Sequence, residues 1–185
     1  MAPEATAGRR VGGRQRAHAV ALLTACFLAA AAAAPAGTTT GSFTVTALVN
    51  SNCLVSALPL NFGTYTPNAG PLKVNTTINV NCTLGTKFTV LLNAGATAGT
   101  SFAQRLLRNS TGGNSDTLQY NLYTSGGYGS IWGDGSSGTS TVTGFGAGTL
   151  TSVQETVYGL LVDSAANQNA SAGTYTDTIT VTVTF

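Results

Sequence analysis

The stretch that decides the fold is residues 175–185, YTDTITVTVTF. Its second half places an apolar side chain at every second position, with threonines between: Ile179, Val181, Val183 and Phe185. This alternation predicts a β-strand with one buried face. A strand exposes unpaired N–H and C=O groups along any edge that lacks a neighbour. Because the sequence ends at Phe185, we expect the neighbour on one side to come from another segment.

The first 36 residues have the pattern of a cleaved export signal. A basic start is followed by an apolar run over 19–34 and small residues at 34–36, and its cations are Arg9, Arg10, Arg14 and Arg16. A membrane anchor is an alternative, but the run is shorter than the roughly 18 residues that a span needs. Lipid attachment at Cys26 is another, but the apolar run continues beyond it. We therefore expect a signal peptide over 1–36, an N-terminal extension over 37–51 and one domain over 52–185.

The composition favours an exported β-protein. Only 8% of the residues are charged, and threonine, serine, glycine and asparagine supply most of the polarity. The net charge of +2 comes from the arginines of the signal, so no basic patch for nucleic acid remains. Two cysteines remain, Cys53 and Cys82, and an even pair in an oxidising compartment favours a disulfide, with free thiols as the alternative.

Short segments of period 2, separated by Gly, Asn and Ser, predict an all-β domain. The expected strands are 42–50, 53–60, 72–83, 87–93, 104–109, 117–124, 140–143, 149–162 (interrupted) and 174–185. No segment has a convincing helical period. Turn density and spacing favour a sandwich of two antiparallel sheets around one core.

The strand expected over 42–50 precedes Cys53, where a second strand already begins. One face carries apolar side chains, and Thr44 and Thr46 lie on the other; the apolar residues are Phe43, Val45, Ala47 and Val49. It is either the first strand of the sandwich or a spare one. As a spare strand it could fill the vacant edge beside 174–185 in another copy, and such a head-to-tail contact generates a fibre.

Five blocks, in order, resemble the spore coat protein U domain family of archaic chaperone-usher pilus subunits. They are NCLVSALPLNFGTYTP (52–67), VNCTLGTKFTVLLNAG (80–95), DTLQYNLYTSGGYGSIWGDG (116–135), VYGLL (157–161) and AGTYTDTITVTVTF (172–185). The resemblance implies an incomplete immunoglobulin-like β-sandwich, completed first by a periplasmic chaperone and then, at an outer-membrane usher, by the N-terminal strand of the next subunit. It implies a Cys53–Cys82 disulfide, a donor strand over 37–51 and an acceptor edge over 179–185. It also implies an extracellular pilus at the cell surface that serves adhesion and biofilm formation.

Catalytic and cofactor sites are not expected. The only histidine, His18, lies in the signal, so a nucleophile would lack its usual base. The carboxylates of the mature chain are scattered and form no motif. We therefore expect a protein that is not an enzyme and that binds no cofactor or metal.

Two other functions remain as alternatives. Tyr123, Tyr128 and Trp132 lie in a glycine-rich region and could form an aromatic platform that binds a sugar or a hydrophobic surface, although Trp132 covering the core is the favoured interpretation. The chain could also be a coat or matrix protein that stays monomeric, with its own N-terminal strand filling the vacant edge.

Overall fold

The structure, a computed structural model, describes residues 35–185. The signal peptide predicted over 1–36 thus falls almost wholly outside the described residues. The chain divides into two compact units, Met1–Val45 and Thr46–Phe185, and the second holds every helix and strand that the structure describes. Residues 35–52 are exposed and belong to no helix or strand. The strand expected over 42–50 is therefore not formed in the isolated chain.

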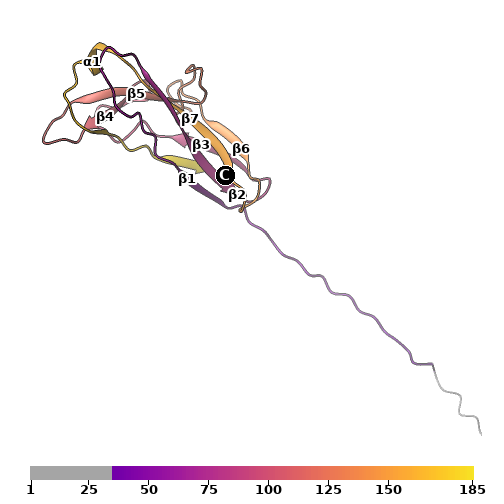
Figure 1. The fold of residues 1–185 in the computed structure, drawn as a ribbon. Helices are drawn as coiled ribbons and strands as arrows, with labels where there is room; N and C mark the ends of the chain where they lie inside the picture. The colour runs from indigo at the N-terminus through magenta and orange to yellow at the C-terminus, as the bar shows by residue number, and fades with distance from the viewer. Residues whose placement is uncertain (1–34) are drawn as a thin grey trace, which may run out of the picture. The chain divides into compact units, whose positions relative to one another are not determined.

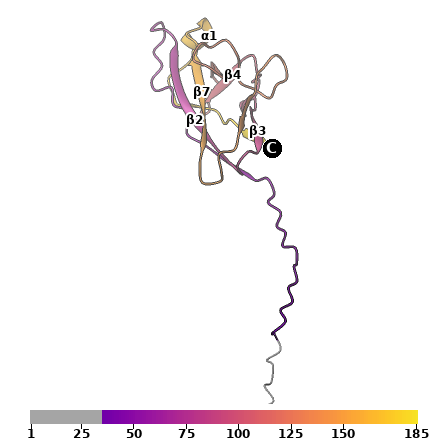
Figure 2. The ribbon, with the colours of Figure 1, turned by 90° about the vertical axis from the view of Figure 1, so that its right-hand side faces the viewer.

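The second unit is a sandwich of two antiparallel sheets (Figure 1). The larger sheet has the order β1-β2-β7-β5-β4-β8. Its strands are β1 (Cys53–Ala57), β2 (Leu72–Cys82), β4 (Arg105–Asn109), β5 (Thr117–Tyr123), β7 (Val153–Leu161) and β8 (Tyr175–Thr176). The smaller sheet has the order β6-β3-β9, with β3 (Lys87–Leu92), β6 (Val142–Phe145) and β9 (Val181–Thr184). Figure 2 places β3 and the C-terminus on one side of the unit, and β2 and β7 on the other.

The core lies between these sheets because β2 and β3 bury alternate side chains. Ile78 and Val80 of β2 face Phe88 and Val90 of β3, and all four side chains are almost fully buried. Val157 of β7 packs in the same cluster. The period of 2 in the sequence thus becomes two apolar faces that exclude water from one another.

The C-terminal stretch differs from the expectation of one long strand. β8 pairs with β4 in the larger sheet, whereas β9 pairs with β3 in the smaller one. Residues 177–180 therefore carry the chain from one sheet to the other. The first body strand also ends early, at Ala57 rather than at 60, and the strand expected over 140–143 is β6, two residues later.

One helical turn, α1 (Ala165–Gln168), was not expected from the sequence. Ser164 begins it by accepting a hydrogen bond from the Asn167 backbone N–H. Asn167 is fully buried and holds the turn against β5, donating to the Gln119 carbonyl at 2.9 Å and accepting from the Gln119 N–H. This turn and the C-terminus lie at opposite ends of the second unit (Figure 1).

Candidate functional site

The sandwich has a vacancy between the sheets along one side. Among residues 35–185, β9 pairs only with β3 and β1 pairs only with β2, so each strand leaves one edge free there. Between these edges runs the segment 58–66, which belongs to no strand. Free backbone groups on both sides of one opening are what an inserted strand would pair with.

Two adjacent cavities occupy this opening, and we call them together the groove. Their volumes are about 390 Å³ and about 620 Å³, and Leu60, Phe62 and Leu107 line both. Asp177 is the only Asp, Glu, Lys or Arg among the lining residues. A groove with so few charged lining residues suits apolar side chains.

The wall of the groove formed by 58–66 depends on a glycine in β7. A Cβ atom at Gly159 would lie 2.9 Å from Leu60 and 3.1 Å from Phe62. Because both neighbours would have to move, any larger residue would push this wall away from the sheet. The edge ring contact of Phe62 with Tyr120, at 5.9 Å between ring centroids, depends on the same close approach.

The opposite wall of the groove is formed by the C-terminal segment that contains β9. Ile179 and Val181 line the groove, and Ile179, Val181 and Val183 pack partly buried against the core. Phe185 differs, because its side chain remains largely exposed at the end of the strand. The structure therefore brings three of the four predicted edge residues to one apolar wall.

Asp177 holds the chain where it changes sheets. Its Oδ1 accepts hydrogen bonds from the N–H groups of Ala96 and Thr97, at 2.9 and 3.0 Å, and from Thr97 Oγ1. Its Oδ2 accepts from the hydroxyl of Tyr120 at 2.7 Å. Burial raises the pKa of Tyr120, so the hydroxyl stays protonated and able to donate. At Gly95, φ is +106° and a Cβ atom would collide with Asp177, so only glycine suits this turn.

A buried arginine lies behind the groove. Arg105 is fully buried, and its guanidinium donates to the carbonyls of Asn93 and Trp132, at 2.8 and 2.7 Å, and to Asn121 Oδ1 at 2.6 Å. Burial lowers the pKa of Arg105 from its ordinary value. The contacts tie β4 to the loops that follow β3 and β5, so Arg105 supports the sheet without facing a ligand.

Tyr65 and Asp163 form a hydrogen-bonded pair near the α1 end of the groove. The Tyr65 hydroxyl donates to Asp163, whose other oxygen accepts from the Gly70 N–H at 2.9 Å. Burial and this hydrogen bond raise the pKa of Tyr65 to about 12. The hydrogen bond lowers the pKa of Asp163 below its usual value. The pair fixes the loop after residue 64 to the end of β7.

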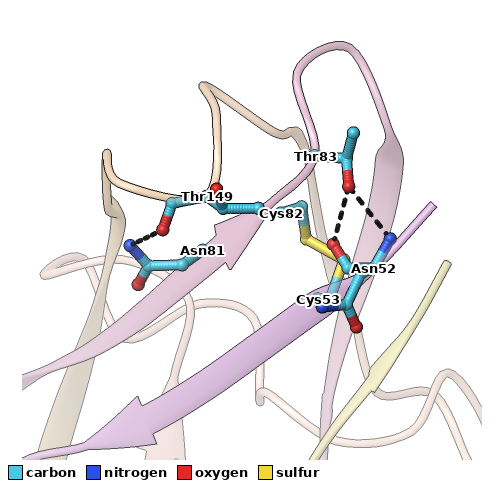
Figure 3. Close-up of a disulfide and its surroundings, with 6 residues drawn as sticks. All are labelled: Asn52, Cys53, Asn81, Cys82, Thr83 and Thr149. Atoms are coloured by element: carbon cyan, nitrogen blue, oxygen red, sulfur yellow. Dashed lines mark hydrogen bonds between the residues drawn. A yellow bond between two sulfur atoms is a disulfide. The ribbon is translucent and has the colours of Figure 1, made fainter. Parts of the chain in front are cut away.

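The predicted disulfide is present at the other end. Cys53 of β1 is bonded to Cys82 of β2, across a sequence separation of 29 residues (Figure 3). A cross-link over a loop of this length stabilises a fold by roughly 3 to 4 kcal/mol in the chain-entropy model. It fixes the first strand of the body at the edge of the larger sheet.

The structure does not bring the three candidate aromatic residues together. Tyr123 and Tyr128 make an edge contact, with 5.3 Å between ring centroids, and Lys73 lies over the Tyr128 ring. Trp132 is fully buried, and its indole N–H donates to the Val90 carbonyl at 3.1 Å. A surface role for Trp132 is therefore wrong, because its ring fills the core as the favoured interpretation expected.

The candidate donor residues are all exposed. Phe43, Val45 and Val49 are among the most exposed large apolar side chains of residues 35–185, and Ala47 is exposed as well. Across those same residues, no group of three or more His, Cys, Asp or Glu is placed to hold a metal ion. No helix among them is long and apolar enough to cross a membrane.

Sequence reasoning missed the polar supports of the groove, Arg105, Asp177 and Tyr120. One signal was available, because side chains two residues apart in a strand share a face, and Arg105 therefore lies on the same inward face of β4 as Leu107. A charged residue on an inward face indicates a buried hydrogen-bond network.

The fold and groove together define a class, an immunoglobulin-like sandwich that lacks one strand. The chain belongs to the Spore Coat Protein U domain family, whose model matches residues 39–182. Comparison with curated protein sequences gives no match.

Among solved structures, the chain is similar to one from Acinetobacter baumannii, a complex of the chaperone CsuC with the tip adhesion subunit CsuE of archaic chaperone-usher Csu pili. The identity is 23% and the TM-score 0.50, which is a likeness of fold. The match covers 74% of this chain but only 40% of the matched chain of that complex.

Proposed function

We propose that the protein is a structural subunit of an adhesive, secreted chaperone-usher pilus and that it polymerises by donor-strand exchange. In this proposal residues 1–36 direct export, 37–51 are the donor strand and 52–185 form the pilin domain. The observation that carries it is the apolar groove beside the free edge of β9, in a chain whose extension carries an exposed segment of alternating apolar and polar residues. Phe43, Val45, Ala47 and Val49 of one copy would enter the groove of the next.

The free energy of such a joint has two sources. Main-chain hydrogen bonds would join the donor strand to β9 on one side and to 58–66 on the other. Residues 58–66 would then become a strand of the same continuous sheet. Each large side chain of the donor, such as Phe43 or Val45, would gain roughly 1.5 to 3 kcal/mol on full burial, before the ordering of the strand is subtracted. A joint of this kind needs no catalytic residue.

A growing fibre also requires that the donor strand run in one particular direction relative to β9. Cys53 and Thr184 lie at the same end of the body, since they neighbour Cys82 and Thr89 on either side of the β2–β3 turn. A donor parallel to β9 would place its own body at this end of the acceptor, where the acceptor's extension also begins. A donor antiparallel to β9 places it at the α1 end, which is free, so copies can add without limit.

Assembly needs partners that protect the groove before the next copy arrives. We infer that a periplasmic chaperone covers it during export and that an outer-membrane usher exchanges the chaperone for the donor strand, ending in an extracellular fibre. The similar solved structure is of a chaperone bound to a pilus subunit before assembly, which supports this order.

Deletion of 41–49 tests the proposal. The variant should still be purified with its chaperone, because the groove is intact, but it should form no fibres by electron microscopy. A matched control, Thr44→Ala with Thr46→Ala, alters the other face of the same strand and should polymerise normally. Fibres of unchanged yield from the deletion variant would refute the donor assignment.

A further inference from the structure

An exposed apolar patch lies at the disulfide end of the body. It consists of Leu84, Phe145 and Leu150, which are 77%, 66% and 99% exposed, and we call it the end patch. Phe145 ends β6, and two hydrogen-bonded loops carry Leu84 and Leu150: the Gly85 N–H donates to the Gly146 carbonyl at 2.8 Å, and the Gly148 N–H donates to the Cys82 carbonyl at 3.2 Å. Neither loop contains a charged residue from 81 to 86 or from 144 to 152. Apolar side chains held together in this way indicate a binding surface.

The N-terminal extension joins the body beside this patch. The Thr83 N–H donates to the Asn52 carbonyl at 2.9 Å. The Asn52 N–H donates to Thr83 Oγ1 at 3.1 Å (Figure 3). The disulfide of Cys53 holds the next residue as well. Asn52 is therefore fixed next to the turn that carries Leu84.

The chain between donor strand and body is too short to separate two copies. From Val49, the last donor side chain, to Asn52 there are three residue steps, which span at most about 10 Å when extended. Under the proposed function, on which this inference rests, the disulfide end of each body must therefore abut the α1 end of the copy that holds its donor strand.

The surface at the α1 end includes small apolar side chains. Ala165 and Ala166 of α1 and Ala172 of the following loop are exposed, and Asp163 beside them is already hydrogen-bonded to Tyr65 and Gly70. We propose that the end patch docks on this surface of the preceding copy, so that adjacent bodies make a second contact besides the shared strand. The contact would limit bending at each joint and shield the patch from water.

Cysteine labelling in fibres of the full chain tests this contact. Leu150→Cys places a thiol in the patch, and Thr156→Cys places one at an exposed position in the middle of β7. The rate of maleimide reaction of each variant in intact fibres is divided by the rate of the same variant unfolded in guanidinium. The native disulfide is left oxidised in both measurements. Because Leu150 is almost wholly exposed in the isolated chain, folding alone cannot protect it. We expect at least tenfold slower labelling of Leu150→Cys than of Thr156→Cys.

Three outcomes would overturn the inference, and each is distinct. Equal rates for the two variants in fibres would remove the docking contact and leave the proposed function standing. Equal protection of Leu150→Cys in the chaperone-bound subunit would assign the patch to the chaperone. Absence of fibres from the unsubstituted chain would remove the proposed function and this inference together.

Discussion

Replacing Val45 by aspartate should prevent fibre formation, whereas the same replacement at Thr46 should not. Val45 is 81% exposed in the isolated chain, so neither change should disturb folding of the body. In the joint, Val45 would enter the groove and Thr46 would face water. The two variants add the same charge one residue apart, so they differ only in the face of the strand that carries it.

The size of the effect follows from the groove. Loss of a buried valine removes roughly 1.5 to 3 kcal/mol. Asp177, the charged residue among those described as lining the groove, could not donate a hydrogen bond to the new carboxylate, because its own oxygens only accept, as they do from Ala96, Thr97 and Tyr120. It would have to be protonated at pH 7, about three units above its ordinary pKa, which costs about 4 kcal/mol. The joint should weaken by about 6 kcal/mol, or about four orders of magnitude in affinity.

The assay is the amount of polymer that survives in unheated detergent gels, together with electron microscopy of secreted material. Val45→Ala provides an intermediate case and should lower the denaturant midpoint of fibre dissociation without abolishing assembly. Fibres from Val45→Asp with none from Thr46→Asp would contradict the assignment of Val45 to the buried face, because this reversed pattern would place the threonines in the groove.

Three further predictions concern the body itself. Trp132→Ala should destabilise the domain by about 3 to 5 kcal/mol in chemical denaturation, because it empties the core beside Val90; a folded variant of unchanged midpoint would contradict the core assignment. Arg105→Met should cost about 3 kcal/mol, since buried oxygens lose their donor, and an unchanged stability would argue against that network. Asp163→Asn should destabilise the protein at neutral pH, because a lowered carboxyl pKa contributes stability above the ordinary pKa of about 4 that is lost as pH falls. The difference from the unsubstituted chain should shrink in urea titrations at pH 3, and an equal gap at both pH values would contradict the role of the Tyr65 contact.

Most strands could be predicted because their cause is local. In β2 and β3 the alternation of apolar and polar residues directly marks which side chains face the core, and turn residues mark where each strand ends. The same holds for the disulfide, which an even pair of cysteines in an exported chain predicts. These features need no knowledge of what lies across the sandwich.

The break between β8 and β9 could not be predicted in the same way. Threonine alternation continues through 176–184, so the local pattern is that of one strand, while β4 pairs with one half and β3 with the other. Asp177 marks the crossing only through partners almost 60 to more than 80 residues away in sequence. Likewise α1 is a single turn, too short for a helical period, and depends on the buried Asn167.

The pattern of 42–50 predicts a strand that the isolated chain does not form. The reason is physical, since a strand with one apolar face gains little without a surface to cover. The groove of the body supplies such a surface. The local sequence of 42–50 does not reveal the groove, and the local sequences that line the groove do not reveal the strand.

Disulfide trapping in fibres measures directly whether the N-terminal strand of one copy lies beside β9 of another. Thr182 is exposed on β9, and neighbouring strands bring residues within the Cα separation of about 4.4 to 6.8 Å that a disulfide needs. Chains carrying Thr182→Cys with either Thr44→Cys or Thr46→Cys should give a ladder of covalent multimers after mild oxidation in at least one pairing. The control pair, Thr156→Cys with the same donor cysteine, should give none. Fibres in which neither Thr182 pairing forms a ladder, or in which the control forms it equally well, would contradict the account.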